Sequence, residues 1–360
     1  MAGAAIGALI GWGVGGTVAA AAIGFSIGRA YDNYKEQKEM MESLNQSPTY
    51  SFGPIRNTKS HEMPIPIIYG QNLVAGNIIN QKIRGENDRY MDLQVGISEG
   101  PIELISEVKA NENNINPQIK LGNREQSAWG NNSHGQTFPY VAHYNTTLDA
   151  KALELSSTPT LTAIVKGRKV RVWDGANWVV EYSDNPAWCL LDFLTNKRYG
   201  LGINDSEIDL ETFKEVAEYA DGTVDGEKRF QLDMVIDSKK SALDIITEIL
   251  STFRGFLFYS DGKLKLKVDR PEAAVQTFEF HDDKEKDNIN EGSFSYSKTS
   301  RKERLKEVTV QYTEPNENYE RISARFTDES FSAKAKQTIT LIGVNRFSQA
   351  GRMARYFQKK

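Results

Sequence analysis

Short β-branched runs separated by Gly, Asn and Pro fill most of residues 63–184, and they restrict this region to a β-sandwich or a barrel. The clearest run is "YMDLQVGISEG", which alternates as a strand with one buried face does. Its apolar positions are Met91, Leu93, Val95 and Ile97, and its polar positions are Asp92 and Gln94. Residues 111–160 are poor in large aliphatic side chains and rich in Asn, Gln, Ser and Gly, so we expect a loop-rich insert there.

The segment "WDGANW" contains an Asp-Gly pair that predicts a tight hairpin with Trp173 and Trp178 on either side of the turn. Two interpretations of the aromatic pair are open. It could bind a sugar or a base, or it could be a cross-strand pair that covers the edge of a core. The second arrangement is common in antiparallel sheets, and we favour it.

The stretch "NPAWCLLDFLTNKRYGLG", residues 185–202, predicts one short helix with both ends marked. Asp184 or Asn185 can cap the helix, and Pro186 suits the first helical position. A basic last turn and then glycines, the first of them Gly200, end it. The apolar stripe at helical spacing consists of Ala187, Leu190, Leu191 and Leu194.

Two amphipathic helices and a hairpin follow this block. The first helix is capped by Asp209, and the second, "SKKSALDIITEILSTFRG", ends at Gly255. A turn at Asp261 and Gly262 then joins "FLFY" to "KLKLKV". Later, "EVTVQY" predicts a strand and "NRFSQAGRMARYFQKK" predicts a helix. The buried faces should contain Phe213, Val216, Ala217 and Ala220; Ala242, Ile245, Ile246, Ile249 and Phe253; Leu264, Leu266 and Val268; Val308, Val310 and Tyr312; and Ala350, Met353, Ala354 and Phe357.

The first 28 residues carry no charged side chain and are dominated by Gly and Ala. As a helix they would span roughly 40 Å, more than the hydrocarbon core of a bilayer. Glycines recur every four residues, which places them on one helix face and allows close packing against another helix or contact with lipid. A flexible apolar leader is the alternative. The candidate packing or membrane-contact residues are Gly3, Gly7, Gly11, Gly15, Gly24 and Gly28.

Composition argues against several kinds of chemistry. The formal net charge of −4 gives no basic excess, so we expect no sequence-specific nucleic-acid binding. One cysteine and four scattered histidines offer no disulfide, and we expect no metal site and no cofactor. The acidic run "HDDKEKD" is typical of a solvated loop, and "GINDSEIDLE" lacks calcium-loop spacing and suits helix capping. No nucleophile elbow or phosphate loop is present, so we expect no catalytic residues and no enzyme.

We therefore expect an α+β, β-rich, multi-domain chain that begins with a Gly/Ala-rich helix. The expected units are an apolar helix over 1–31, a charged helix and linker over 32–53, a β-domain over 54–184 with its insert at about 111–160, a small helix-and-hairpin α+β domain over 185–280, and the start of a further β-domain over 281–360. Because that last unit would still lack strands, we expect the chain to be truncated or completed by another chain.

Residues 185–202 resemble the hallmark block of the tail hub proteins of long-tailed bacteriophages, the host-specificity protein J family of lambda-like phages. "IPIIYG", "VAGNII" and "GISEGPIELISEV" resemble the N-terminal hub region of that family. "DSKKSALDIITEILSTFRGFLFYSDGKLKLKVDRP", "FSYSKTSRKERLKEVTVQYTEP" and the last helix resemble the segments that follow. The resemblance covers roughly residues 63–360 without the insert. The block residues that carry it are Pro186, Ala187, Trp188, Arg198, Tyr199 and Gly200.

The resemblance implies a virion structural protein: a homotrimeric hub at the phage tail tip that closes the tail tube, supports host attachment and passes DNA during ejection. It implies contacts with other tail-tip and tape-measure proteins, and assembly in the host cytoplasm. Under this reading Trp188, Phe193 and Tyr199 are core or interface anchors. The leader, a possible glycine zipper, could plug the lumen or touch the host membrane through residues 1–28. The alternative is a membrane-anchored surface protein with a glycan-binding β-domain.

Overall fold

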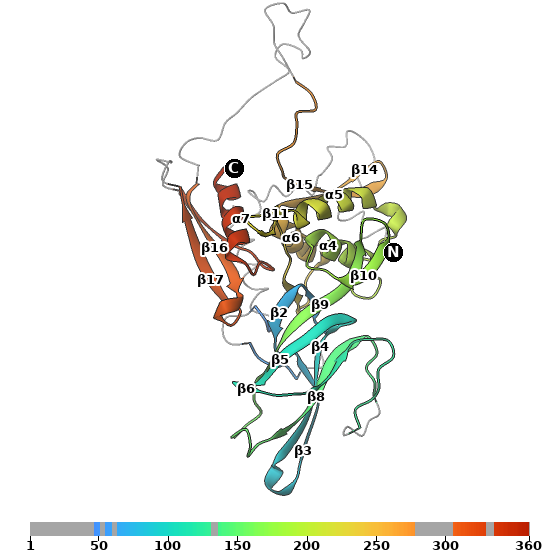
Figure 1. The fold of residues 1–360 in the computed structure, drawn as a ribbon, viewed down its shortest axis with the longest axis vertical. Coiled ribbons are helices and arrows are strands. Elements are labelled where there is room, and N and C mark those ends of the chain that lie inside the picture. The colour runs from blue at the N-terminus through green and yellow to red at the C-terminus, as the bar shows by residue number, and fades with distance from the viewer. Residues whose placement is uncertain are drawn as a thin grey trace, which may run out of the picture.

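The structure, a computed structural model, describes residues 47–50, 55–59, 63–130, 136–277, 305–328 and 335–359 (Figure 1). Two larger antiparallel sheets form the β-rich part. A four-stranded sheet has the order β3-β4-β8-β7, and a five-stranded sheet has the order β10-β9-β5-β6 with β2 also paired to β9. The strands are β2 Gln71–Val74, β3 Asn77–Arg84, β4 Tyr90–Glu99, β5 Ile102–Ala110, β6 Asn113–Asn114, β7 Gln118–Leu121, β8 Val141–Asp149, β9 Leu161–Trp173 and β10 Trp178–Tyr182.

Three helices and two short hairpins lie beyond the upper ends of β9 and β10 in Figure 1. Helices α4, α5 and α6 begin at the expected positions, and the hairpin β14–β15 turns at the Asp261-Gly262 pair as predicted. The predicted end of α4 is wrong: the helix ends at Thr195, and the basic residues and Gly200 lie in the turn that follows it. The bounds are α4 Pro186–Thr195, α5 Leu210–Asp221, α6 Ala242–Phe253, β11 Thr223–Val224, β12 Glu227–Lys228, β14 Gly255–Ser260 and β15 Lys263–Val268. Short 3-10 turns lie at Glu86–Asp88, Asp205–Glu207 and Pro315–Glu317.

The C-terminal part is a three-stranded sheet, β17-β16-β18, with α7 packed on it (Figure 1). Its elements are β16 Leu305–Glu314, β17 Glu320–Thr327, β18 Ala335–Thr340 and α7 Phe347–Lys359. Strands β16 and β17 are antiparallel, whereas β16 and β18 are parallel. The predicted buried faces of β16 and α7 are confirmed, because their apolar side chains are at most 4% exposed: Val308, Val310, Tyr312, Ala350, Met353, Ala354 and Phe357.

One expectation about the first β-region is wrong, and another overlooked a strand. Strand β4 is buried on both faces and not on one, because Asp92 and Gln94 are satisfied by side chains from the neighbouring strands. Asp92 accepts hydrogen bonds from Arg84 at 2.8 Å and from Thr147 at 2.6 Å. The interval expected to be a loop-rich insert contains β8, a nine-residue strand that pairs with the full length of β4. The strand was not predicted because it contains Asn and Thr residues, and the prediction relied on large aliphatic side chains.

Distant parts of the chain are joined through a short ladder. Strand β1, Ile67–Tyr69, pairs antiparallel with β13, Met234–Ile236, on the far side of α4 and α5 in the sequence. One continuous cluster of buried apolar side chains, with members from Tyr50 to Phe357, includes residues of the β-sheets, of α4 to α6 and of the C-terminal sheet with α7. The divisions at residues 184 and 280 stay predictions, and this shared core shows how closely the proposed units are packed.

Candidate functional site

The hallmark block, residues 185–202, begins with an asparagine that joins two helices. Asn185 is completely buried, and its Oδ1 accepts a hydrogen bond from the backbone N–H of Ala187 at 3.0 Å, which caps α4. Its Nδ2 donates to the backbone carbonyl of Ala217 at 2.9 Å and to Asp221 at 2.8 Å, both on α5. One side chain therefore fixes the start of α4 against the end of α5.

One carboxylate joins α4 to the sheets. The Oδ2 atom of Asp192 accepts hydrogen bonds from the Tyr69 hydroxyl at 2.7 Å and from the Tyr199 hydroxyl at 2.6 Å. Tyr69 lies on β1 and is completely buried, while Tyr199 belongs to the turn after α4. Because both bonds end on a carboxylate, they are of the stronger, charge-assisted kind.

These groups hold their protons. Burial, and next the charge of Asp192, raise the pKa of the Tyr69 phenol well above its usual value, and the same two causes raise the pKa of Tyr199. Burial also raises the pKa of the Cys189 thiol, so the thiolate that a nucleophile requires is disfavoured. The arrangement suits permanent hydrogen bonding and not proton transfer.

The turn after α4 also contacts the β-sheets through two arginines. Arg198 donates from Nε to Glu99 of β4 at 3.0 Å. Arg168 of β9 donates to the backbone carbonyl of Gly100, and its guanidinium carbon lies 5.2 Å from the centre of the Tyr199 ring. The hallmark turn therefore lies directly on the junction between β4 and β5.

The chain folds back along α4 at Gly200. The N–H of Leu201 donates to the Phe193 carbonyl at 3.1 Å, and the N–H of Ile203 donates to the Leu194 carbonyl at 2.9 Å. A Cβ atom placed on Gly200 would lie 2.0 Å from the Phe193 carbonyl oxygen. The close approach of two backbone segments accordingly requires glycine at this position.

The predicted tryptophan pair is packed within the chain. Trp173 and Trp178 are register partners with ring centres 5.5 Å apart, and Trp178 meets Trp188 of the hallmark block edge to face at 5.6 Å. The Lys214 ammonium lies 3.7 Å from the centre of the Trp173 ring, which covers one face with a cation. This environment supports the cross-strand interpretation over an open sugar platform.

The six hallmark residues gather at the two ends of α4. At the first end, Trp188 meets Trp178 of the tryptophan hairpin. After the second end, Arg198 and Tyr199 contact residues of the sheets, and Gly200 packs against the last turn of α4. The sequence reading did not identify the residues that complete the contacts: Tyr69, Glu99, Arg168 and Asp192. Only Asp192 carried a local signal, because it is the one charged residue within an otherwise apolar helix.

Several sequence predictions fall outside the described residues. The candidate packing positions Gly3, Gly7, Gly11, Gly15, Gly24 and Gly28 all lie there, as do three of the four histidines. Among the helices that the structure does describe, none is long and apolar enough to cross a membrane. Over the same residues, no cluster of three or more His, Cys, Asp or Glu side chains is arranged to hold a metal ion.

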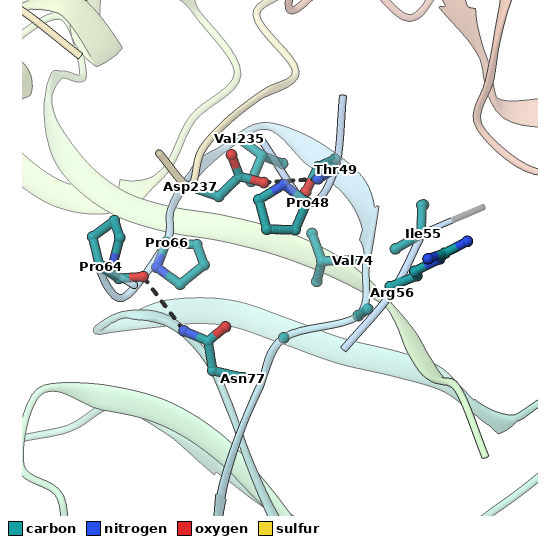
Figure 2. A pocket seen from close by; sticks show the side chains of 12 residues that line it. Pro48, Thr49, Ile55, Arg56, Pro64, Pro66, Val74, Asn77, Val235 and Asp237 are labelled. Atoms are coloured by element: carbon teal, nitrogen blue, oxygen red, sulfur yellow. Dashed lines mark hydrogen bonds between the residues drawn. The ribbon is translucent and has the colours of Figure 1, made fainter. Parts of the chain in front are cut away.

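A small hollow lies where the segment at residues 47–50 packs on the β1–β2 region (Figure 2). In Figure 2 the Asp237 carboxylate accepts the backbone N–H of Thr49 at 2.9 Å, and Asn77 donates to the Pro64 carbonyl at 3.4 Å. The free volume is about 10 Å³, the room of one water molecule. It is a packing gap between prolines, too small for a ligand.

We expect Tyr199→Phe to lower the free energy of unfolding by about 2 kcal/mol, because it removes a hydrogen bond to a charged carboxylate while keeping the ring. Urea unfolding of the full chain measures the change. Tyr259→Phe is the matched control, since Tyr259 is 41% exposed and should give a change close to zero. Equal effects from the two variants would contradict the structural role of the Asp192 cluster.

Comparison with known proteins finds similarity to phage tail and virion proteins. Residues 241–360 match the family described as "Putative phage tail protein". The solved virion of a native gene transfer agent particle contains a chain that matches with a TM-score of 0.56 at 14% identity, over 99% of this chain and 84% of that one. At that identity the likeness shows the fold alone, a β-rich fold shared with a virion protein. The family match is thus to a phage-tail protein, and the structural match is to a chain of a virion particle.

Within this class, two relatives are named tip attachment protein J. The relative from Escherichia phage SECphi27 is 30% identical over 197 residues, which is 52% of this chain and 16% of the relative. The relative from Escherichia phage SECphi4 is 28% identical over 239 residues, which is 60% of this chain and 20% of the relative. The chain thus spans a fifth or less of these relatives. The matches confirm the resemblance to the protein J family that the hallmark block indicates.

Proposed function

We propose that this chain is a structural subunit of a bacteriophage tail tip and does not act as an enzyme. The observation that supports this most directly is the use of the hallmark block. Within the block, Asn185 joins α4 to α5, Arg198 bonds to a sheet residue, and Tyr199 bonds to Asp192, so these side chains serve structure. The names of the relatives point to the same virion location.

The finer proposal is a homotrimeric hub that closes the tail tube, supports host attachment and allows DNA delivery. Its partners would be other tail-tip proteins and the tape-measure protein, with assembly in the host cytoplasm. The division into β-domains and a helix-and-hairpin domain is part of this proposal. It rests on the matches to part of the two proteins named tip attachment protein J and on the family match over residues 241–360.

The glycine-rich start, residues 1–31, is proposed to pack against its copies in the hub lumen or to contact the host membrane during delivery. The basis is its lack of charge and its four-residue glycine spacing. A peptide of these residues that leaves dye-loaded liposomes intact, and does not insert into them, would rule out the membrane contact.

The oligomeric state tests the hub proposal. We expect light scattering of the purified full chain to give three times the monomer mass of 40.4 kDa, and a variant lacking residues 1–31 to stay trimeric, because the symmetry is proposed to reside in the β-domains. A monomer in both forms would remove the main physical support for the hub. A monomer that co-purifies with membranes would instead favour the surface-protein alternative, whose proposed sugar platform is covered by Lys214.

A further inference from the structure

A basic hollow of about 210 Å³ lies between α7, the end of α6 and the chain that follows β12, outside the hallmark block. These elements lie beside one another in Figure 1. Four of its lining residues are arginines and none is acidic. The arginines are Arg229, Arg254, Arg352 and Arg355, and Phe230 and Met353 add an apolar wall.

Within the described residues, the arginines are held by neutral groups. Arg352 donates from Nη2 to the backbone carbonyl of Arg229 at 2.7 Å, and Arg229 donates from Nη1 to the Tyr219 carbonyl at 2.5 Å. The Arg254 guanidinium lies 5.1 Å from the centre of the Phe230 ring and 4.9 Å from that of Tyr356. These contacts fix the orientation of three guanidinium groups and leave their charge without a carboxylate partner among their recorded bonds.

Two atoms of this cluster are left unsatisfied. The Nε atoms of Arg254 and Arg352 are buried and have no hydrogen-bond partner. Burial, and next the nearby charge of Arg346, lower the pKa of Arg352, while the charges of Glu227 and Asp225 outside the lining of the hollow oppose this shift. An entering anion would offset the mutual repulsion of the arginines.

The volume of the hollow and its apolar wall favour a carboxylate side chain over other anions. Guanidinium groups match the planar, two-oxygen geometry of a carboxylate. A hollow of about 210 Å³ admits one side chain but not a nucleic-acid duplex, and the net charge of −4 provides no general attraction for DNA. The apolar wall of Phe230 and Met353 suits the methylene groups that precede a glutamate carboxylate.

We propose that this hollow is a docking site for an acidic side chain, a glutamate or aspartate, presented by a partner protein. The carboxylate lies among Arg254, Arg352 and Arg355, and its stem lies on the apolar wall. The site is independent of the hub proposal, because it requires only a protein partner with an exposed acidic segment. If the chain is not a trimer, the proposed docking site is unaffected. If the docking site fails its own test, the hub proposal is unaffected.

Calorimetry on the full chain tests the site with three probes at matched ionic strength: hexaglutamate, inorganic phosphate and a short single-stranded oligonucleotide. We expect hexaglutamate to bind most tightly. Arg355→Gln should weaken that binding about tenfold by removing one charge-assisted contact, and Arg352→Gln should weaken it at least as much. Arg355 is exposed, so its variant should fold normally. Arg124→Gln, an exposed arginine in a distant loop, is the control and should bind as the parent does.

Each other outcome overturns the proposal. If no probe binds, the hollow is not an anion site. If phosphate or the oligonucleotide binds more tightly than hexaglutamate, the site recognises a phosphate group and not an acidic side chain. If hexaglutamate binds the Arg355→Gln and Arg352→Gln variants as it binds the Arg124→Gln control, the peptide is bound elsewhere on the chain.

Discussion

Gly200→Ala should destabilise the chain by about 3 kcal/mol or more, which exceeds the expected effect of removing any single hydrogen bond in the hallmark block. The added Cβ would lie 2.0 Å from the carbonyl oxygen of Phe193 and 2.9 Å from that of Asn196. Both neighbours are backbone atoms at the end of α4, so relief requires moving the helix end or the returning chain. Either movement would strain the contacts of Leu201 and Ile203 with the helix.

Urea unfolding of the full chain, followed by far-UV circular dichroism, measures this effect. Gly130→Ala is the matched control, because a Cβ at Gly130 would meet nothing within 4 Å, and neither glycine has a positive φ. The control should change the free energy of unfolding by no more than about 0.5 kcal/mol. Similar midpoints for the two variants would show that the turn can relax, and that Gly200 is not required by close packing.

The helices and hairpins were predictable because their signals are local. Asn185 with Pro186 marks the start of α4, and the Asp261-Gly262 pair fits the two-residue turn between β14 and β15. The apolar stripe of α7 repeats at helical spacing and is buried as expected. In each case the residues that decide the structure lie within one turn or one hairpin of each other.

The errors arise where tertiary partners decide. Strand β8 contains His143, Asn145 and Thr146, which are buried because β4 and β7 flank them, and no local pattern reports that. The pairing of β1 with β13 joins residues separated by more than 160 positions. The register of such a pair cannot be predicted from a single sequence, since many short apolar runs could pair with β1 equally well.

The same limit applies to the hallmark block. The sequence singled out Tyr199 and Gly200, and their spacing after α4 was visible. Their physical roles depend on partners from other elements: the Asp192 carboxylate shared with Tyr69, and the Glu99 side chain that binds Arg198. The block is therefore recognisable as a motif in the sequence, but its structural role is to hold α4 against α5 and against the β-sheets.

A buried carboxylate outside the block carries the second large prediction. Asp233 is 9% exposed, and burial raises its pKa to about 7, with a further increase from Asp184 and a decrease from Arg346. Its Oδ1 accepts the backbone N–H of Gln71 at 2.8 Å, a bond that an asparagine oxygen can also accept. Asp233→Asn should therefore keep the hydrogen bond while removing the cost of burying a charge.

The sign follows from proton binding. The folded-state pKa lies above the unfolded value of 3.8, so between these two values the folded chain binds more protons than the unfolded chain. Stability contributed by this group is therefore lost as pH rises from about 4 to about 7, and the loss is complete above pH 7. We expect Asp233→Asn to raise the free energy of unfolding by about 4 kcal/mol at pH 8, and by only about 2 kcal/mol at pH 5.

Unfolding curves of the full chain at the two pH values measure this difference. Asp261→Asn is the matched control, because its carboxylate sits in an exposed turn, where the hydrogen bond from Lys265 lowers its pKa. The control should gain no stability at pH 8. A pH-independent gap between Asp233→Asn and the parent would mean that Asp233 ionises normally in the folded chain. Asp233 would then not make the stability of the folded chain depend on pH. Its carboxylate would be solvated enough to carry a charge.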